Sequence, residues 1–583
     1  MRGLFRLAYA DTLAGNCPLS VTSQPEYLLH SSRAAAPHEA AEPDQRAGAS
    51  TARVQPGGLP GWWSLGTAIV AGLALAAAFP PLGLWPMAMA GPALLTLAVR
   101  EKNWRAALGL GLSCGTVFFV ALLSWLVNVA WYAWIALTVT EALIFGVLTI
   151  ALVPLLRLRA WPLAVAGWWV AQELVRGTFP WGGFPWGRLA MSQAGAPTAG
   201  WAAIGGPPLL SFLLALAGAT IAYLVVAVTG TRRRDRGADD GQIAAPRFGS
   251  RLRQLSPAIA ACVIVAGLVL TGDLAWQPAF RNDPTAVVAT VQGDVPHARN
   301  LPNLLRASTV TANHAAATVA LAGQVRAGRR PAPSVVIWPE NSTDIDPSLS
   351  PSTYHAIATA VDAIGRPVLV GAVLDNPLRN AGQLWLPGRG PVGNYIKRQL
   401  VPFGEVIPLR GLLDNVTSLP SLQPVNFTPG HRAVVFGIGK VRLGDVICYE
   451  VGYDNLVRSE VLAGANLLTV QTNDADYELD GQVGETEQQL AMARMDAIWT
   501  GRSVAVASTT GISAIIAPDG TVLTQSRIWQ RAELEARVPL VSALTPADRA
   551  GNWPELAITG LTGLALAWSL ARAWRRRSLP ERA

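Results

Sequence analysis

Eight apolar runs constrain the fold of this chain more than any other feature of its sequence. They lie at 62–79, 82–99, 106–126, 131–156, 161–175, 199–228, 257–271 and 556–571. Most approach the roughly 20 residues that a helix needs to cross the hydrocarbon core of a membrane, and flanking Trp or Pro can extend the short ones. Charged residues make up only 14% of the 583 residues, against roughly 25% in soluble proteins. The sequence therefore predicts a multi-pass α-helical membrane bundle with eight spans.

Basic residues in the connections between the runs predict the orientation of the bundle. Short loops on the cytoplasmic side of a membrane are enriched in Lys and Arg. The connections after the second, fourth and sixth runs and the segment after the eighth are basic, whereas those after the first and third carry no charge. We therefore expect both termini in the cytoplasm and the long segment after the seventh run outside the plasma membrane. This bias explains the net charge of +8 better than nucleic-acid binding does.

The same runs divide the chain. We expect a disordered cytoplasmic tail at 1–61, a six-span bundle at 62–228, a basic cytoplasmic loop at 229–255, a seventh span at 256–275, an extracytoplasmic domain at 284–547, an eighth span at 555–573 and a basic cytoplasmic tail at 574–583. The first segment is rich in Ala, Pro, Ser and Arg and has no sustained apolar period, which is typical of disorder.

The outer segment alternates between strand-like and helix-like patterns. Strands are predicted at 286–292, 335–338, 367–373, 383–386, 394–400, 434–446, 466–471, 503–508, 513–517 and 521–524. Helices are predicted at 301–326, 353–364, 454–462 and 485–498. Such alternation indicates an α/β layered domain.

Three chemically useful side chains follow apolar strands of this domain. Cys448 ends the run 441–447, Glu340 follows the strand at 335–338, and Lys397 precedes a second carboxylate, Glu405. A thiolate is a nucleophile, but a free thiol is only a few per cent ionised at pH 7, so it needs a base and a cation nearby. The three side chains together predict an acyl-transfer site. Taken singly, Cys448 could be a small core residue, Glu340 a cap and Lys397 a solvated strand residue.

The four cysteines favour neither a disulfide framework nor a metal site. Cys17, Cys114, Cys262 and Cys448 are scattered over different segments and have no metal-ligand spacing. We therefore expect no metal and no cofactor.

Several motifs carry a resemblance to known proteins. Three of them resemble the Glu-Lys-Cys motifs of the nitrilase superfamily, namely Pro339-Glu340, Tyr395-Ile396-Lys397 with Pro402-Phe403-Gly404-Glu405, and Cys448-Tyr449-Glu450. The match extends to Thr472-Asn473-Asp474, Gly501-Arg502 and Gly511-Ile512-Ser513. Within that superfamily the chain is similar, over about 62–573, to the apolipoprotein N-acyltransferase family, through its eight runs, Val291-Gln292-Gly293 and the loop Gly183-Phe184-Pro185-Trp186.

The resemblance implies a nitrilase-like αββα sandwich for the outer domain and an acyltransferase activity in lipoprotein biosynthesis. The acyl donor would be a membrane phospholipid. The acceptor would be the N-terminal amine of a diacylglyceryl-modified apolipoprotein, and a thioester would link the two steps in a ping-pong scheme. The resemblance implies no cofactor and no nucleic acid, and we expect a monomer.

The resemblance also assigns roles to residues. Cys448 would be the nucleophile, Glu340 would move protons, and Lys397 would stabilise the thiolate and the oxyanion of the tetrahedral intermediate. The supporting or substrate-binding residues would be Glu405, Tyr449 and Glu450.

The chain departs from the family pattern at Asp476, where relatives often carry an aromatic residue, and at Asp496 and Trp499, where they commonly carry Arg and Glu. These departures leave the three catalytic candidates intact and bear on efficiency and substrate preference. Two alternatives stay open at this point. One is a membrane-tethered amidase of small amides, and the other is a catalytically weakened paralogue that binds lipoproteins.

Overall fold

The computed structural model describes residues 59, 61–237, 248–275, 283–296, 302–413, 423–475, 477–478 and 481–578. Almost all of the predicted tail at 1–61, part of the predicted loop at 229–255, the end of the predicted tail at 574–583 and the position of Asp476 lie outside the described residues.

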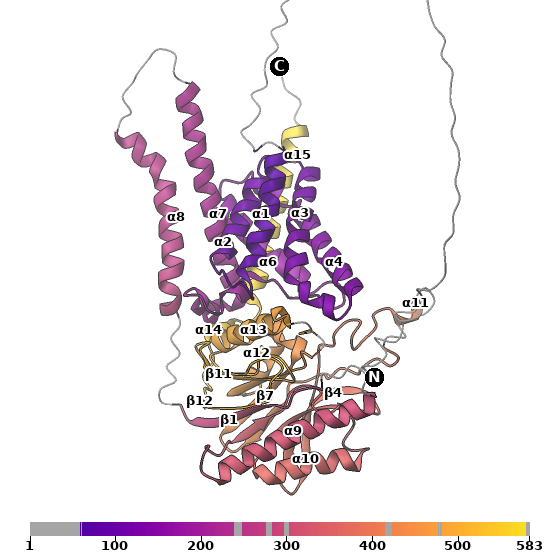
Figure 1. Ribbon diagram of the computed structural model, residues 1–583. Coiled ribbons are helices and arrows are strands. Elements are labelled where there is room, and N and C mark those ends of the chain that lie inside the picture. The colour runs from indigo at the N-terminus through magenta and orange to yellow at the C-terminus, as the bar shows by residue number, and fades with distance from the viewer. Residues whose placement is uncertain are drawn as a thin grey trace, which may run out of the picture. The chain divides into compact units, whose positions relative to one another are not determined.

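A helix occupies most of each of the eight predicted runs (Figure 1). The helices are α1 (Gly61–Ala78), α2 (Met87–Val99), α3 (Trp104–Leu122), α4 (Trp131–Thr149), α5 (Leu152–Leu155), α6 (Trp161–Arg176), α7 (Ala202–Gly237), α8 (Phe248–Ala275) and α15 (Trp553–Ser578). Helix α7 is kinked at Gly205 and Gly206, where the backbone is not helical. Short 3-10 turns lie at Ser124–Asn128, Leu189–Gln193 and Ala199–Trp201.

Five of these segments within the described chain are long and apolar enough to cross a membrane. They are Gly61–Ala78, Trp104–Leu122, Trp131–Leu155, Ala199–Thr229 and Trp553–Arg576. The apolar helices Met87–Val99 and Ile259–Gly272 are shorter. A helix of 13 residues rises only about 20 Å, less than the roughly 30 Å of the hydrocarbon core. The described helices therefore support a membrane protein with several spans. The predicted number of eight spans remains a prediction.

A buried ion pair joins two helices of the bundle. Arg176 of α6 contacts Glu141 of α4, with 3.0 Å between Nη1 and Oε2, and both side chains are almost fully buried. Glu173 lies three residues before Arg176 in the same helix. Glu173 instead accepts hydrogen bonds from Trp169 Nε1 and from the backbone N–H of Leu189. A charge at membrane depth needs a partner, and the long Arg176 side chain reaches the more distant carboxylate.

The strands of the described outer domain form two six-stranded sheets. The first sheet runs β12 (Ala532–Pro539), β1 (Thr285–Gln292), β2 (Val335–Ile337), β3 (Val368–Leu374), β4 (Arg379–Leu386) and β5 (Gly390–Ile396). The second runs β11 (Val522–Gln525), β10 (Ala514–Ile516), β9 (Ser503–Ser508), β8 (Leu467–Thr472), β7 (Val441–Ile447) and β6 (Val435–Ile438). Strands β1, β2 and β3 of the first sheet are parallel, and so are β7, β8 and β9 of the second. In each sheet the carboxyl ends of these three strands therefore lie at one edge.

Helices cover the outer face of each sheet. They are α9 (Asn303–Arg326) and α10 (Pro351–Ile364) on the first sheet and α12 (Asp454–Leu462) and α13 (Gly484–Thr500) on the second, with the short α11 (Arg410–Leu413) and α14 (Pro546–Ala550) in connections. Alternate residues of a strand face opposite layers. Val288 therefore packs between the sheets, whereas its neighbour Ala289 packs against α9 and α10. This arrangement confirms the predicted α/β layered domain (Figure 1).

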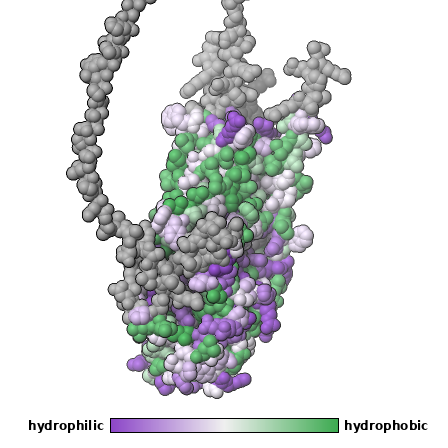
Figure 2. Space-filling model, turned by 90° about the vertical axis from the view of Figure 1, so that its right-hand side faces the viewer, coloured by the Kyte–Doolittle hydropathy of each residue, from purple (hydrophilic) through white to green (hydrophobic). Residues whose placement is uncertain are grey.

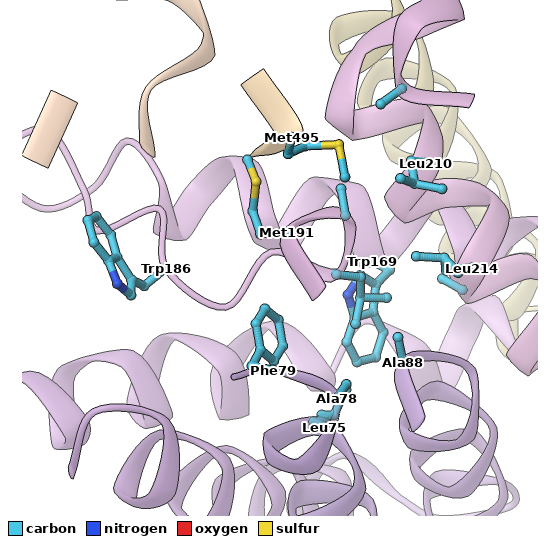
Figure 3. Close-up of a cluster of buried hydrophobic side chains, with 14 of the residues drawn as sticks. Leu75, Ala78, Phe79, Ala88, Trp169, Trp186, Met191, Leu210, Leu214 and Met495 are labelled. Carbon is cyan, nitrogen blue, oxygen red and sulfur yellow. The ribbon is translucent and has the colours of Figure 1, made fainter. Parts of the chain in front are cut away.

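One hydrophobic core continues from the bundle into the second sheet's helices. Met191, between α6 and α7, lies beside Met495 of α13 in this core (Figure 3). Polar contacts add to it, because Trp125 Nε1 donates to Gln488 Oε1 at 3.3 Å and Gln488 Nε2 donates to the carbonyl of Leu122 at 3.1 Å. On the face shown in Figure 2, hydrophobic residues cover much of the bundle, whereas the domain is more hydrophilic. Bundle and domain therefore share an interior.

Candidate active site

Cys448 occupies the turn that follows β7. The thiol residue begins a 3-10 turn (Cys448–Gly452) with a backbone φ of +52°. A positive φ is uncommon for a residue with a Cβ and persists only where surrounding structure holds it, often at functional sites. The side chain is 6% exposed, so this turn presents a nearly enclosed sulfur at the carboxyl edge of the sheet.

A lysine between two carboxylates lies on the first sheet. Glu340 follows β2 after Pro339, which cannot continue the hydrogen-bonded ladder, and Lys397 directly follows β5. Lys397 Nζ lies 3.0 Å from Glu340 Oε1 and 3.1 Å from Glu405 Oε1. Lys397 is 1% exposed, so the two carboxylates compensate a charge that water does not reach.

Asn380 completes this cluster and was missed by the sequence reasoning. Its Nδ2 donates to Glu340 Oε1 at 2.6 Å and to Glu405 Oε1 at 2.8 Å. Asn380 lies within β4, and its backbone carbonyl accepts from the N–H of Lys397 at 2.9 Å. No motif marked this residue, because antiparallel pairing of β4 with β5 alone brings it beside Lys397.

The electrostatics link the sulfur to the lysine cluster. Burial raises the pKa of the Cys448 thiol well above its ordinary value, and the carboxylate of Glu340 adds to this rise, whereas Lys397 lowers the pKa. Burial also lowers the pKa of Lys397, but Glu340 and Glu405 outweigh it and hold that pKa well above its ordinary value. The charge of Lys397 therefore favours the thiolate form of Cys448, which burial and Glu340 disfavour.

Glu450 ties the segments of the site together. Its carboxylate accepts from the backbone N–H groups of Ile447, Arg398 and Gln399 at 2.8, 2.7 and 3.0 Å. The hydroxyl of Tyr395 also donates to it at 2.8 Å. These bonds join the turn that carries Cys448 to the segment that carries Lys397.

Tyr449 connects the thiol-bearing turn to the membrane bundle. Its hydroxyl donates to the carbonyl of Gly183 at 2.8 Å, and that of Tyr453 donates to the same carbonyl at 3.0 Å. The Tyr449 ring stacks on Trp186, with 5.5 Å between ring centroids. The loop at 178–187 after α6 therefore packs against the residue that follows Cys448.

The structure places the sequence-predicted residues in two contacting groups, which are connected by Glu450 and by the electrostatic action of Glu340 and Lys397 on Cys448. Glu340, Lys397 and Glu405 touch directly, whereas Tyr449 and Glu450 surround the turn of Cys448. Among the departures from the family pattern, Trp499 Nε1 donates to Asp496 Oδ1 at 2.8 Å. The two departures therefore form one hydrogen-bonded pair within α13.

A separate cavity of about 300 Å³ lies where the bundle meets the domain. Its lining includes Gly182, Tyr453 and Arg188, but not Glu340, Lys397 or Cys448. Arg188 is held there by an ion pair with Asp454 at 2.9 Å. Among the described residues no group of three His, Cys, Asp or Glu side chains could hold a metal ion.

Comparison with known proteins gives the family. A family model described as the apolipoprotein N-acyltransferase N-terminal domain matches residues 71–220, and one described as carbon-nitrogen hydrolase matches residues 287–544. Three similar relatives are each named apolipoprotein N-acyltransferase. The one from Mycolicibacterium smegmatis is 37% identical, covering 86% of this chain and 85% of that relative. The one from Azotobacter vinelandii is 29% identical, covering 89% and 97%, and the one from Pseudomonas aeruginosa is 28% identical, covering 88% and 96%. With this similarity along most of its length, the chain belongs to the apolipoprotein N-acyltransferase family.

Proposed function

We propose that this protein moves an acyl chain from a membrane phospholipid to the N-terminal amine of a diacylglyceryl-modified apolipoprotein. The observation that carries this proposal is the contact of Lys397 with Glu340 and Glu405, of which Lys397 and Glu340 act electrostatically on a buried Cys448 with a positive φ. Family membership supports the choice of substrates, since the relatives are named for this reaction.

In the first step the Cys448 sulfur attacks the ester carbonyl of the phospholipid. Glu340 accepts the thiol proton and returns it to the departing lysophospholipid oxygen. Lys397 stabilises the thiolate and the oxyanion, and a preorganised donor of this kind contributes about 3 to 4 kcal/mol to transition-state stabilisation. The product is an acyl thioester on Cys448.

In the second step the lipoprotein amine attacks the thioester carbonyl. Glu340 accepts a proton from the attacking amine and returns it to the departing sulfur. Glu405 shares the Lys397 ammonium with Glu340 and so holds it in place, whereas Glu450 and Tyr449 fix the turn that carries the sulfur. The free thiol is then ready for another phospholipid.

Both proposed substrates carry lipid chains, so the site is expected to lie next to the membrane. We propose eight spans, both termini in the cytoplasm, a catalytic domain on the outer side of the plasma membrane and a monomeric enzyme. A site packed against the bundle avoids lifting acyl chains into water, which costs about 0.8 kcal/mol per exposed methylene. The contact of Tyr449 with the loop after α6 supports this placement.

Trapping of the acylated enzyme tests the function. Full-length protein in nanodiscs that contain a labelled phospholipid should gain the mass of one acyl chain on Cys448 and lose it when a diacylglyceryl-cysteine peptide is added. Cys448→Ala should not be labelled, whereas Cys262→Ala, at an exposed thiol on α8, should behave as wild type. Labelling of Cys448→Ala to the wild-type level would refute the proposal. Release of free fatty acid without peptide acylation would favour hydrolysis instead.

A further inference from the structure

The side chain of Gln489 lies against the sulfur of Cys448. Gln489 belongs to α13 and is 4% exposed, and Glu485, one turn earlier, is 3% exposed. Gln489 Nε2 lies 3.7 Å from Cys448 Sγ and also donates to Glu485 Oε1. Residues four apart on a helix share a face, so the two side chains form one unit directed at the thiol.

The hydrogen bond to Glu485 orients the Gln489 amide so that its NH₂ group lies against the sulfur. The carboxyl Oε1 accepts hydrogen bonds, so it selects the NH₂ end of the amide. One hydrogen of that group is held by Glu485, and the other is available to the sulfur. In the structure Glu485 Oε1 accepts from the NH₂ group, and a flipped amide would require a proton on that oxygen, because the amide carbonyl can only accept.

The surroundings of Gln489 differ from those of a glutamine that only stabilises the fold. Its Oε1 has no hydrogen-bond partner within the described residues, and such a buried polar atom costs stability. The adjacent Gln488 is a contrast, because its amide contacts Trp125 Nε1 and the carbonyls of Pro80 and Leu122. Gln488 joins bundle and domain, whereas Gln489 faces the reacting atom.

We propose that Gln489 donates a hydrogen bond to the Cys448 sulfur and stabilises its thiolate form, with Glu485 as the positioning residue that holds the amide. This deepens the proposed function and rests on Cys448 as the nucleophile. The groups that act on the sulfur electrostatically or by hydrogen bonding include Glu340, Lys397, Glu485 and Thr472.

The proposed donor opposes a large unfavourable influence. Burial, followed by Glu340, raises the pKa of the thiol, and Glu485 also raises that pKa. Lys397 and a hydrogen bond from Thr472 lower the pKa. Gln489 is a second neutral donor that would lower the thiol pKa. Because its amide is uncharged, it adds no further buried charge next to the sulfur.

The pH dependence of alkylation measures this effect directly. Full-length protein in nanodiscs is treated with iodoacetamide between pH 6 and pH 11, and the peptide that carries Cys448 is followed by mass spectrometry. We expect Gln489→Met, which keeps the length of the side chain, to move the midpoint up by about one pH unit and to slow alkylation at pH 7.5 about tenfold. Gln488→Met is the matched control and should leave the midpoint unchanged.

Two further variants guard the alkylation experiment against misfolding and test the role of Glu485. If Gln489→Met does not fold, as judged by tryptophan fluorescence, Gln489→Asn replaces it, because the shorter amide cannot reach both Glu485 and the sulfur. Glu485→Gln keeps an acceptor for the amide and removes a carboxyl group that raises the thiol pKa, so its midpoint should fall below that of the wild type. A midpoint raised as far as in Gln489→Met would contradict the proposal that an acceptor at this position is enough to hold the amide.

A wild-type midpoint and rate in both Gln489 variants would overturn the proposal. This outcome is distinct from failure of the proposed function, since alkylation needs neither phospholipid nor lipoprotein. Absence of acyl transfer by the wild-type protein would leave the alkylation result standing.

Discussion

Asn380 shows how one neutral amide can hold two carboxylates and an ammonium together. Its Nδ2 donates to both Glu340 and Glu405, which also share Lys397. Only one oxygen of Glu340 takes part in these contacts, and this leaves the other oxygen for proton transfer. Removing the amide would weaken the alignment of Glu340 without removing any of the three proposed catalytic groups.

Asn380→Ala should therefore slow thioester formation at least tenfold. A hydrogen bond to a charged group contributes about 1.5 to 3 kcal/mol, which corresponds to a factor of about 10 to 100. The rate of acyl transfer from labelled phospholipid to Cys448 measures the loss. Gln383→Ala is a suitable control, because Gln383 lies in the same strand but contacts Trp385 instead. Equal rates for Asn380→Ala and the control would contradict this role.

At the scale of elements, the sequence reasoning located most of the outer domain. Strands and helices lie within a few residues of their predicted positions, because each has a clear periodicity and a marked end. Glu340, Lys397 and Cys448 were predicted as site candidates because each lies near the end of a strand and their segments resemble the Glu-Lys-Cys motifs. Asn380 and Gln489 lie inside elements, so only tertiary packing reveals them.

Strand β12 was missed altogether. Its alternation of Glu533, Glu535 and Arg537 with smaller residues gives a weak signal, since a charged strand resembles an exposed connection. The strand forms because β1 offers it an edge, with Thr290 opposite Leu534. Pairing between segments more than 200 residues apart in sequence cannot be predicted from either segment alone.

The segment between β8 and α13 carries buried carboxyl groups that make stability depend on pH. Burial, and then the charge of Asp474, raises the pKa of Glu478 to about 9 from an ordinary value of 4.5. The folded protein therefore keeps a proton that the unfolded chain releases above about pH 4.5. The stability from this group is present below that pH and is lost as pH rises toward 9, by up to about 1.4 kcal/mol per pH unit.

Glu478→Gln should flatten this dependence, because glutamine has no proton to release. Between pH 5 and pH 8 its thermal unfolding midpoint, followed by tryptophan fluorescence in detergent, should fall less than that of the wild type. Asp519→Asn, in an exposed turn, should retain the wild-type slope. A parallel decrease in Glu478→Gln and wild type would show that Glu478 titrates normally.

At the scale of the whole molecule, a loop of the bundle contacts the turn that carries Cys448. Gly183 has a φ of +75°, and a Cβ there would lie 2.1 Å from the carbonyl carbon of Gly177. The carbonyl of Gly183 also accepts hydrogen bonds from Tyr449 and Tyr453. Trp181 of the same loop packs edge-on against Phe403, with 5.6 Å between ring centroids.

Gly183→Ala should displace this loop and reduce acyl transfer to Cys448 more than tenfold. The added methyl group must move backbone atoms, and it also strains a left-handed conformation. Gly109→Ala, in α3 where a Cβ meets nothing within 4 Å, should retain activity. The measurement is single-turnover acylation in nanodiscs, with circular dichroism to show that both variants are folded. Full activity of Gly183→Ala would mean that the loop does not position the turn.

The shared interior of bundle and domain, seen where Met191 meets Met495, joins the helices of the second sheet rigidly to the bundle. A reactive atom at constant height selects its substrates by geometry before any side chain recognises them. In the proposed membrane arrangement, esters and amines at that depth of the bilayer surface would reach the sulfur by lateral diffusion, whereas equally reactive molecules in deeper lipid or in open water would not.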